Sequence, residues 1–399
     1  MRRVLFYTVF DVSPQKGGTE RITETISRYL RATVGYKCYL SYSRELPDAF
    51  IKSNCFDGRL KLYEHSSEKE TVDFIISHRI DYIIVQGSYT IIPFLRTLVN
   101  KYELRTKIIF VHHFNPGAEI YFNNFMTKWL GVRRGKSLKD KMKALLSVVK
   151  LPYTRLYYEC FVRHSYHNVY NMSDAVVLLS DKFIPKWMRV ANIKDSSKFH
   201  VIHNSLTFDT FLTEHEIQAK KQEVLLVARL SEHQKRIKLA LKIWKKIKQS
   251  SDAKDWILKI VGNGPWLEDY VDYVFKNDID SVFFEGVREN VIDYYRNASI
   301  FLMTSNFEGW GLTLTESQQM GVIPIVFNSY ESLTDIISDG FNGYIIENND
   351  MNAFKDKVLY VMNNKEEREL VAINCIKSSK RFSIDIIGKN WMELMDKLG

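Results

Sequence analysis

Short runs of β-branched and aromatic residues alternate along the chain with longer stretches whose apolar residues recur at helical spacing. In the first half, these strand-like and helix-like segments are Val4–Phe10, Glu20–Ala32, Tyr82–Gln86, Ile91–Lys101, Ile108–His112, Ala175–Leu179 and His200–His203. Strands that alternate with helices predict βαβ units, and βαβ units predict a parallel sheet.

The same alternation begins again after the polar segment Thr207–Gln222. Its segments are Glu223–Val227, Ile237–Gln249, Ile257–Val261, Trp266–Phe275, Val282–Glu285, Val291–Arg296, Ile300–Thr304, Leu312–Met320, Ile323–Phe327 and Ala353–Asn363. A last amphipathic stretch, Ser383–Leu398, predicts a closing helix.

These patterns predict an α/β protein made of two Rossmann-like, doubly wound domains that face each other across a cleft. We expect the first domain to comprise residues 1–207 together with a helix in 380–399 that crosses back to it, and the second to comprise residues 208–379. Ligands of open α/β sheets bind beyond the carboxyl ends of the strands, so the loops at this cleft are the expected site.

Composition narrows the class of protein. The four cysteines form no C-x-x-C pair, which favours packed thiols in a reducing compartment. The apolar start of the chain ends at Asp11 with no cleavage site after it, so it predicts a first strand rather than a secretory signal. No run approaches the roughly 18 apolar residues of a membrane span. We expect a cytoplasmic protein that can attach peripherally to the inner face of the plasma membrane.

The formal charge of +9 favours a polyanionic partner. Nucleic acid, an anionic membrane and a diphosphate substrate all satisfy that charge, so its distribution along the chain has to decide among them.

Two carboxylates stand eight residues apart in the segment that follows Thr304. Two glycines intervene, so Glu308 is expected in a loop and Glu316 about one turn inside the following helix. The backbone amides of Gly309, Trp310, Gly311 and Leu312 would then form an anion cradle at the helix N-terminus, with an acid on each side. For the motif alone, a helix cap with two solvated glutamates is the simpler explanation.

Basic residues follow the strand that opens the second half. Arg229 comes at the end of this strand and Lys235 six residues later, so two cations can face one diphosphate. A basic stretch that caps the following helix is the structural alternative.

In the first half, Gly17 and Gly18 separate the first strand from the first helix, which lets a phosphate or an acceptor approach the backbone. His112 and His113 end a later strand, where a histidine can form a hydrogen bond with a hydroxyl of the donor sugar or with the acceptor. A simple strand-to-helix turn and a structural histidine are the corresponding alternatives.

Several motifs occur together in one order, and together they favour the functional interpretations over the structural alternatives. They are Val261-Gly262-Asn263-Gly264-Pro265, Phe284-Glu285-Gly286, Glu308-Gly309-Trp310-Gly311 through Glu316 to Gly321 and Pro324, and Asp339-Gly340-Phe341-Asn342-Gly343. In this order they resemble glycosyltransferase family 4, also called glycosyl transferases group 1, a retaining family with the GT-B fold. Two departures are mild: two residues separate Gly321 from the proline, and Asp335 stands where relatives usually carry Glu.

The resemblance implies roles for single residues. Glu316 would bind the ribose of a nucleotide-sugar donor, Glu308 the donor sugar, and the amides of Gly309 to Leu312 the diphosphate. Arg229 and Lys235 would also bind the diphosphate, and the family's H-x-x-P pattern favours His113 over His112. Further donor-binding residues would be Gly17, Gly18, Gly262 and Arg288. The family needs no metal or other cofactor, and Asp278 to Asp280 is interpreted as a polar turn rather than a metal site.

The resemblance therefore predicts a retaining hexosyltransferase that uses a nucleotide-diphosphate sugar, with UDP favoured and GDP as the alternative. Its acceptor would be a glycan or a lipid-linked glycan of cell-surface polysaccharide synthesis. Two other classes stay open: a nucleotide-sugar epimerase on the same fold, and a non-catalytic basic protein that binds membrane or nucleic acid.

Cations are concentrated in Lys128–Arg155, where nine lysines and arginines accompany the single acid Asp140 and apolar residues recur at helical spacing. Such a segment can lie on an anionic bilayer, or it can be an ordinary solvated helix that packs its apolar stripe inward. Nucleic acid fits less well, because no recognition module accompanies the charge.

Overall fold

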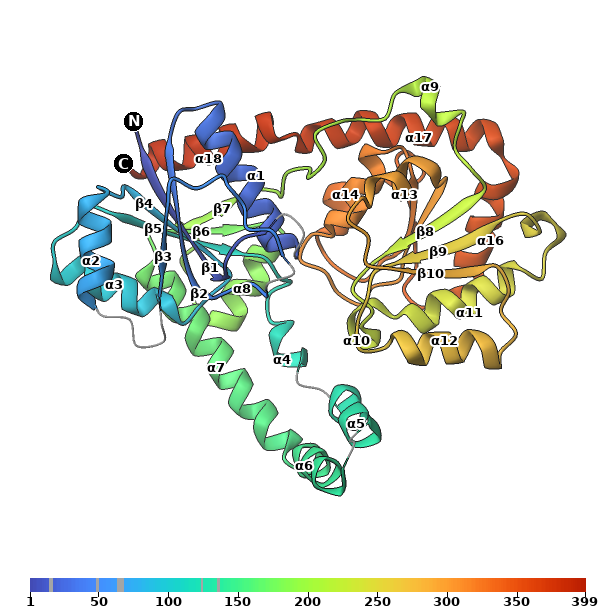
Figure 1. Ribbon diagram of the computed structural model, residues 1–399, viewed down its shortest axis with the longest axis horizontal. Coiled ribbons are helices and arrows are strands. Elements are labelled where there is room, and N and C mark those ends of the chain that lie inside the picture. Colours follow the sequence, from blue (N-terminus) through green and yellow to red (C-terminus); the bar gives the residue numbers. More distant parts are fainter. Residues whose placement is uncertain (14–16, 48–49, 63–67, 123–124, 135–136) are drawn as a thin grey trace. The chain divides into compact units, whose positions relative to one another are not determined.

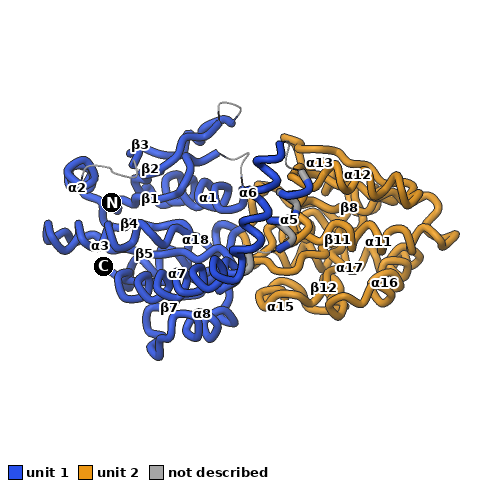
Figure 2. The backbone as a smooth tube through the Cα atoms, turned by 90° about the horizontal axis from the view of Figure 1, so that it is seen from below, with its two compact units in different colours: residues 1–205, 384–399 blue, residues 206–383 orange. Residues whose placement is uncertain are grey.

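The computed structural model describes residues 1–399 except for 14–16, 48–49, 63–67, 123–124 and 135–136. The chain forms two compact units, and Figure 2 shows them in different colours. Unit 1 contains residues 1–205 and 384–399, and unit 2 contains residues 206–383. The chain thus returns to its first unit at its carboxyl end.

Unit 1 is built on a parallel sheet with the strand order β3-β2-β1-β4-β5-β6-β7. Its strands are β1 (Arg3–Phe10), β2 (Lys37–Arg44), β3 (Gly58–Lys61), β4 (Tyr82–Gln86), β5 (Lys107–His112), β6 (Ala175–Leu178) and β7 (Phe199–Val201). All five residues of β4 are buried, as expected of a strand covered by helices on both faces. The strand order reverses between β1 and β4, so the carboxyl ends of these strands define a topological switch point.

The helices of unit 1 cover both faces of this sheet or extend from it (Figure 1). They are α1 (Gly18–Ala32), α2 (Glu68–Ser77), α3 (Ile91–Lys101), α4 (Glu119–Phe122), α5 (Phe125–Arg134), α6 (Leu138–Val149), α7 (Leu151–Met172), α8 (Phe183–Ala191) and α18 (Ile384–Leu398). The closing helix α18 packs on α1 so closely that a Cβ on Gly388 would lie 2.2 Å from the Tyr29 ring. Tyr82 also donates a hydrogen bond to the Met395 carbonyl at 2.6 Å.

Unit 2 repeats the plan with a parallel sheet in the order β10-β9-β8-β11-β12-β13. Its strands are β8 (Glu223–Val227), β9 (Ile257–Val261), β10 (Val282–Gly286), β11 (Ile300–Met303), β12 (Ile323–Phe327) and β13 (Tyr344–Ile346). Its α-helices are α9 (Glu214–Ile217), α10 (Glu232–Lys235), α11 (Ile237–Ile247), α12 (Leu267–Lys276), α13 (Ile292–Asn297), α14 (Leu312–Gln319), α15 (Leu333–Ile336), α16 (Met351–Asn363) and α17 (Lys365–Ser379). The order reverses between β8 and β11, which places the switch point of this unit beside the loops that follow Val227 and Met303.

Candidate functional site

The loop after β11 carries the first predicted acid. Glu308 is only 7% exposed, and its Oε1 lies 2.5 Å from Nζ of Lys235 at the end of α10. The structure therefore joins two predicted site residues, one from each side of the switch point, in a buried ion pair. Gln234 contributes a longer contact of 3.5 Å from Nε2 to the other carboxylate oxygen.

Arg236 holds the two segments of this pair together. It adopts a left-handed backbone conformation with φ of 50° directly after Lys235. Its side chain donates to the carbonyls of Thr304 and Ser305 at 2.6 and 3.0 Å and also to the amide oxygens of Asn348 and Asn349. Sequence reasoning passed over Arg236, because nothing in the pattern distinguishes it from its basic neighbours. Its contacts fix the loop that presents Glu308.

The second predicted acid lies one turn inside α14. Glu316 is 1% exposed and accepts hydrogen bonds from the Thr207 hydroxyl at 2.7 Å and from the Tyr295 hydroxyl at 3.1 Å. Each carboxylate oxygen thus accepts a hydrogen bond from a hydroxyl, and a carboxylate oxygen can accept more than one such bond. A hydroxyl-bearing ligand could share this carboxylate without displacing either contact.

The segment between the two acids has a fixed backbone. Gly311 has φ of 91°, a left-handed conformation that side chains rarely adopt, and α14 begins at Leu312 immediately after it. Ser332 donates to the Gly309 carbonyl at 3.0 Å. The Trp310 side chain is buried and packs edge-on against Phe382. The first amides of α14 lack helical acceptors by geometry, which suits them to an anion.

The loop after β8 carries Arg229, which is exposed. Within the described part of the chain, its side chain forms no hydrogen bond or ion pair. Gly262 supports this loop, because a Cβ there would lie 2.0 Å from the Ala228 carbonyl oxygen. The observed role of Gly262 is therefore close backbone packing beside Arg229.

Arg288 is engaged elsewhere. Its guanidinium lies 3.1 Å from Glu285, whose carboxylate also accepts a hydrogen bond from Tyr294 at 2.8 Å. These contacts place Arg288 at the end of β10 and not in the cluster formed by Lys235 and Glu308.

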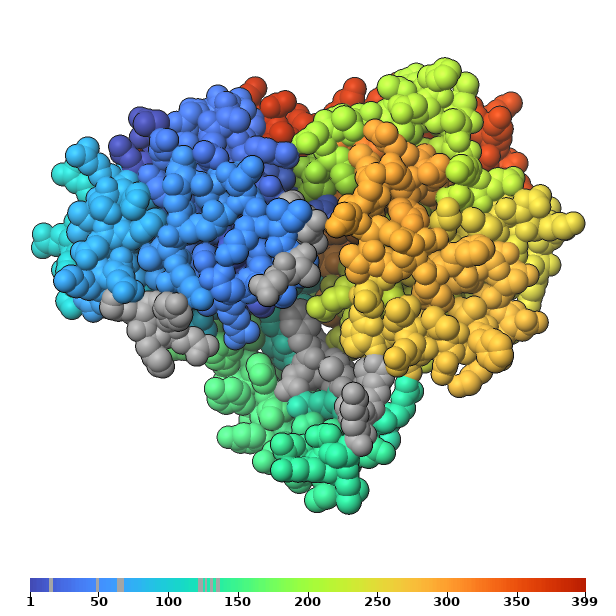
Figure 3. Space-filling view, in the orientation of Figure 1, coloured from blue at the N-terminus to red at the C-terminus, as the bar shows by residue number. Residues whose placement is uncertain are grey.

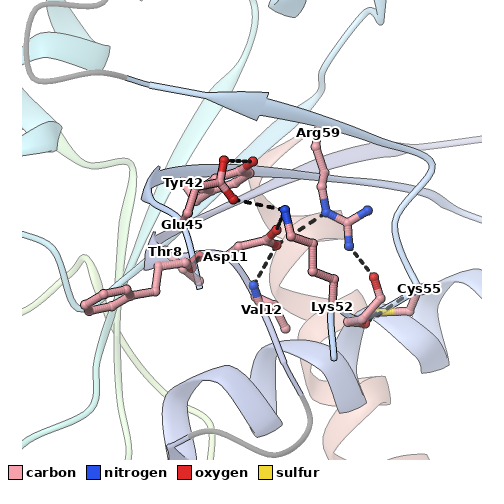
Figure 4. Close-up of polar contacts among 10 residues, drawn as sticks. Thr8, Asp11, Val12, Tyr42, Glu45, Lys52, Cys55 and Arg59 are labelled. Atoms are coloured by element: carbon pink, nitrogen blue, oxygen red, sulfur yellow. Dashed lines mark hydrogen bonds and ion pairs between the residues drawn. The ribbon is translucent and has the colours of Figure 1, made fainter. Parts of the chain in front are cut away.

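In unit 1, Gly17 immediately precedes α1 and Gly18 is its first residue. Residues 14–16, which lead into them, lie outside the described part of the chain. A polar cluster fixes the chain just before this point: the buried Asp11 carboxylate lies 3.2 Å from Lys52 and 3.3 Å from Arg59 (Figure 4). The Val12 amide also donates to Asp11 at 2.8 Å. Asp11 thus holds the carboxyl end of β1 in place ahead of the glycine pair.

His113 follows β5 and is partly exposed. Its Nε2 lies 2.5 Å from the amide oxygen of Gln86 at the end of β4. Because an amide oxygen can only accept, Nε2 carries the proton and Nδ1 is left as an acceptor. Burial by the surrounding groups lowers the pKa of His113 to about 4, so the ring is neutral at physiological pH.

His112 belongs instead to a buried network. The hydroxyls of Tyr89 and Tyr166 lie 3.3 Å from its two ring nitrogens, and Tyr166 also donates to both oxygens of Glu119 at 3.0 Å. Burial raises the pKa of Glu119 and lowers that of His112. This network orders the loop that carries His113. Because the residues of this network are far apart in sequence, no local sequence pattern predicts it.

The low pKa of His113 predicts a pH dependence of stability. The unfolded histidine has a pKa near 6.5 and the folded one about 4, so between these values the unfolded state binds more protons. The free energy of unfolding should therefore fall as the pH drops from 6.5 to 4, with His113 contributing on the order of 2–3 kcal/mol. Urea titrations across this range should show a shallower fall for His113→Asn, and His215→Asn, at an exposed position, is the control. An unchanged slope for His113→Asn would contradict a neutral folded ring.

Within the described residues, no group of three or more histidine, cysteine, aspartate or glutamate side chains could hold a metal ion. Asp278 and Asp280 lie in the turn between α12 and β10, where the Asp280 carbonyl accepts from the Trp244 indole at 3.1 Å. This segment is therefore engaged in packing contacts.

Comparisons with known proteins place this site in a family. Residues 208–377 match the profile described as "Glycosyl transferases group 1". An uncharacterized glycosyltransferase of Methanocaldococcus jannaschii is 29% identical over 131 residues, which are 32% of this chain and 37% of that protein. The amylovoran biosynthesis glycosyltransferase AmsD of Erwinia amylovora is 24% identical over 232 residues, covering 57% of this chain and 63% of AmsD. The matches thus span less than two thirds of either relative's length.

Solved structures extend the likeness to the whole chain. The Anabaena protein HepE in complex with UDP-glucose superposes with a TM-score of 0.71 at 14% identity, and the match covers 100% of both chains. At this identity the likeness concerns the fold, so the prediction of two Rossmann-like sheets in a GT-B fold is confirmed. Within its second unit, the chain matches the glycosyl transferases group 1 family over residues 208–377, as the motifs of that segment predict.

Proposed function

We propose that this chain is a retaining glycosyltransferase that transfers a hexose from a nucleotide-diphosphate sugar, preferably a UDP-sugar, to a glycan or lipid-linked glycan acceptor. The observation that carries the proposal is the ion pair between Lys235, at the end of α10, and the buried Glu308, in the loop that leads to Glu316. An ion pair at a switch point, next to a helix N-terminus, supports binding of a ligand that is both anionic and hydroxylated. The UDP-glucose bound to HepE supports the choice of base.

In this proposal the donor occupies unit 2, which we assign as the donor domain of residues 208–379. Glu316 accepts hydrogen bonds from the ribose, while Lys235, Arg229 and the amides of Gly309 to Leu312 bind the diphosphate. Glu308 accepts a hydrogen bond from the hexose. Lys235 holds that carboxylate in place through the ion pair at 2.5 Å.

The reaction needs no nucleophile from the protein. The bond from the anomeric carbon to the diphosphate oxygen breaks, and the acceptor oxygen bonds to the same face of the sugar. The acceptor hydroxyl gives its proton to the departing diphosphate oxygen. Arg229 and Lys235 stabilise the charge that develops on the diphosphate, and each contributes a few kcal/mol, about what one such group supplies elsewhere.

We assign acceptor binding to unit 1, the predicted domain of residues 1–207 with 380–399. The Gly17–Gly18 turn leaves the backbone open to a donor phosphate or to the acceptor. The Nδ1 atom of the neutral His113 ring can accept a hydrogen bond from a hydroxyl of the donor sugar or of the acceptor. The name of AmsD, an amylovoran biosynthesis enzyme, supports a polysaccharide acceptor. The four free cysteines support action in a reducing compartment, the cytoplasm.

Donor binding tests this proposal directly. A UDP-sugar should raise the thermal unfolding midpoint in EDTA as much as in magnesium, because cationic side chains replace a metal at the diphosphate. At a hundred times Kd the stabilisation should be about 2.7 kcal/mol. GDP- and ADP-sugars at equal concentration establish the preference for the base, and transfer to a glycan acceptor should likewise survive EDTA.

Two results would contradict the proposal. Turnover that EDTA abolishes and magnesium restores would require a metal that the assigned residues do not provide. Conversion of the donor into its epimer without any acceptor would place the chain among the epimerases.

A further inference from the structure

A helical projection extends from unit 1 between β5 and β6. It consists of α5, α6 and the first half of α7, and Figure 1 shows it reaching away from the sheet of its own unit. Figure 3 shows the same segment in green on the molecular surface. It contains the basic segment Lys128–Arg155, of which Lys136 lies outside the described residues and the side chain of Arg134 is not described.

Most of the large apolar side chains of α6 are exposed to solvent. Five of them share one face at helical spacing: Leu138, Met142, Leu145, Leu146 and Val149. All five are exposed, Leu138 by 77% and Val149 by 70%. The least exposed residues of α6 are Ala144, Ser147 and Val148, which lie on the opposite face. The stripe is therefore not packed inward, which excludes the ordinary solvated helix as its explanation.

The first half of α7 repeats this arrangement. Its exposed stripe also follows helical spacing and consists of Tyr153, Leu156, Tyr157, Cys160 and Phe161, with Tyr153 exposed by 74%. Farther along α7, Val162, Ser165, Tyr166 and Val169 are buried. The helix thus changes from an outward apolar face to an ordinary packed face where it meets the sheet.

Cations border the stripe of α6. Lys139, Lys143 and Lys150 follow one edge of it and Lys141 lies at the other edge, as the helical repeat places them. Among the described residues, none of these four lysines forms an ion pair. The single acid, Asp140, is occupied in a capping box with Ser137 at 2.7 to 3.2 Å. Long cationic side chains beside an apolar stripe can extend their ammonium groups to phosphates while the stripe enters hydrocarbon.

We infer that this projection docks the protein onto an anionic lipid bilayer, with the apolar stripe of α6 inserted at the level of the headgroups and the bordering lysines bound to lipid phosphates. Exposed tyrosines on α7 extend the contact, since amphipathic aromatic rings favour the membrane interface. No helix in the described part of the chain is long and apolar enough to cross a bilayer. The stripe occupies one face of α6 and lysines border it, as in a helix that lies in the membrane interface.

The positive charge beside the stripe favours an anionic bilayer over a second copy of the chain as the binding partner. A second copy of the chain would bring the same lysines face to face, and like charges oppose such pairing. An anionic bilayer satisfies the stripe and the lysines together. Membrane docking goes beyond the proposed function. It is tested by measuring lipid binding, which does not depend on enzymatic turnover.

The exposed Cys160 provides the probe, because Cys38, Cys55 and Cys375 are buried. A polarity-sensitive fluorophore attached to Cys160 should shift to shorter wavelength when phosphatidylglycerol-containing vesicles are added, and not with phosphatidylcholine vesicles alone. Co-sedimentation of the unlabelled protein should follow the same lipid preference and weaken as salt is added. Lys139→Glu, Lys143→Glu and Lys150→Glu combined should weaken vesicle binding roughly 100-fold or more.

Two controls distinguish docking through the projection from the effect of net charge and from nonspecific hydrophobic binding. Lys276→Glu, Lys365→Glu and Lys377→Glu combined remove the same charge from exposed positions of unit 2 and should change binding less than about threefold. Met142→Ser, Leu145→Ser and Leu146→Ser combined should weaken binding roughly tenfold or more, whereas Phe275→Ser, at another exposed apolar position, should not.

The inference is overturned if the wild-type protein ignores anionic vesicles at low ionic strength. It is also overturned if both lysine triples weaken binding equally, which would indicate a diffuse charge effect. A concentration-dependent dimer that the apolar substitutions dissolve, without any vesicle binding, would identify a second copy as the occupant. Thermal unfolding of each variant verifies folding, and donor binding should stay unchanged in all of them.

Discussion

Replacing Glu308 with glutamine should lower kcat for sugar transfer roughly 100- to 1,000-fold while the affinity for the nucleotide-sugar changes by less than about threefold. The substitution keeps the shape of the side chain and removes its charge. Lys235, 2.5 Å away, then loses its partner, and the carboxylate that we assign to the hexose is no longer available. Interactions that strengthen as the sugar departs affect kcat more than binding.

Unit 2 offers a matched control for this variant. Glu223 is also buried and pairs with a lysine, Lys259, at 2.9 Å, yet it lies at the beginning of β8, at the opposite edge of the sheet from the switch-point loops. Glu223→Gln should therefore affect stability about as much as Glu308→Gln does and leave kcat nearly unchanged. If the two variants lose kcat equally, Glu308 has a structural role. The same conclusion follows if both variants keep the kcat of the wild-type protein.

Much of the fold could be predicted because central parallel strands are continuous apolar runs. β1, β4, β5, β8 and β12 all have this character, and the structure confirms them. Strand β3 (Gly58–Lys61) and strand β13 (Tyr344–Ile346) went unpredicted, because three or four residues at a sheet edge carry too little pattern. Strand β2 (Lys37–Arg44) was missed because serines interrupt its apolar run, although Ser41 is buried.

The candidate site was predictable where the position of a residue depends on its neighbours in the sequence. The glycines of the motif place Glu308 in a loop and Glu316 one turn inside a helix, and the structure has both there. The pairing of Glu308 with Lys235 was not predictable. It joins residues 73 positions apart through the left-handed turn at Arg236, which no local signal announces. Likewise, only the structure shows that the apolar stripe of α6 faces outward.

Replacing Glu316 with alanine should weaken nucleotide binding roughly 10- to 100-fold, and UDP itself should be affected as much as the UDP-sugar. The reason is that we assign Glu316 to the ribose, which both ligands share, and not to the sugar that distinguishes them. The hydroxyls of Thr207 and Tyr295 should also lose their hydrogen bonds to Glu316, which should lower the free energy of unfolding by about 1 kcal/mol for each bond. Isothermal titration with UDP and with UDP-sugar measures the affinities, and urea unfolding measures the stability.

The control for this substitution stands on the same helix. Gln318 is fully buried and donates to the Asn342 carbonyl at 2.9 Å, so Gln318→Ala also removes a buried hydrogen bond from α14. It should lower stability to a similar degree and leave nucleotide affinity within about twofold. Tyr295→Phe, which removes one of the two hydroxyls that orient Glu316, should weaken UDP binding by an intermediate factor. If Glu316→Ala and Gln318→Ala reduce affinity equally, the loss comes from a loosened helix, and Glu316 does not bind the ribose.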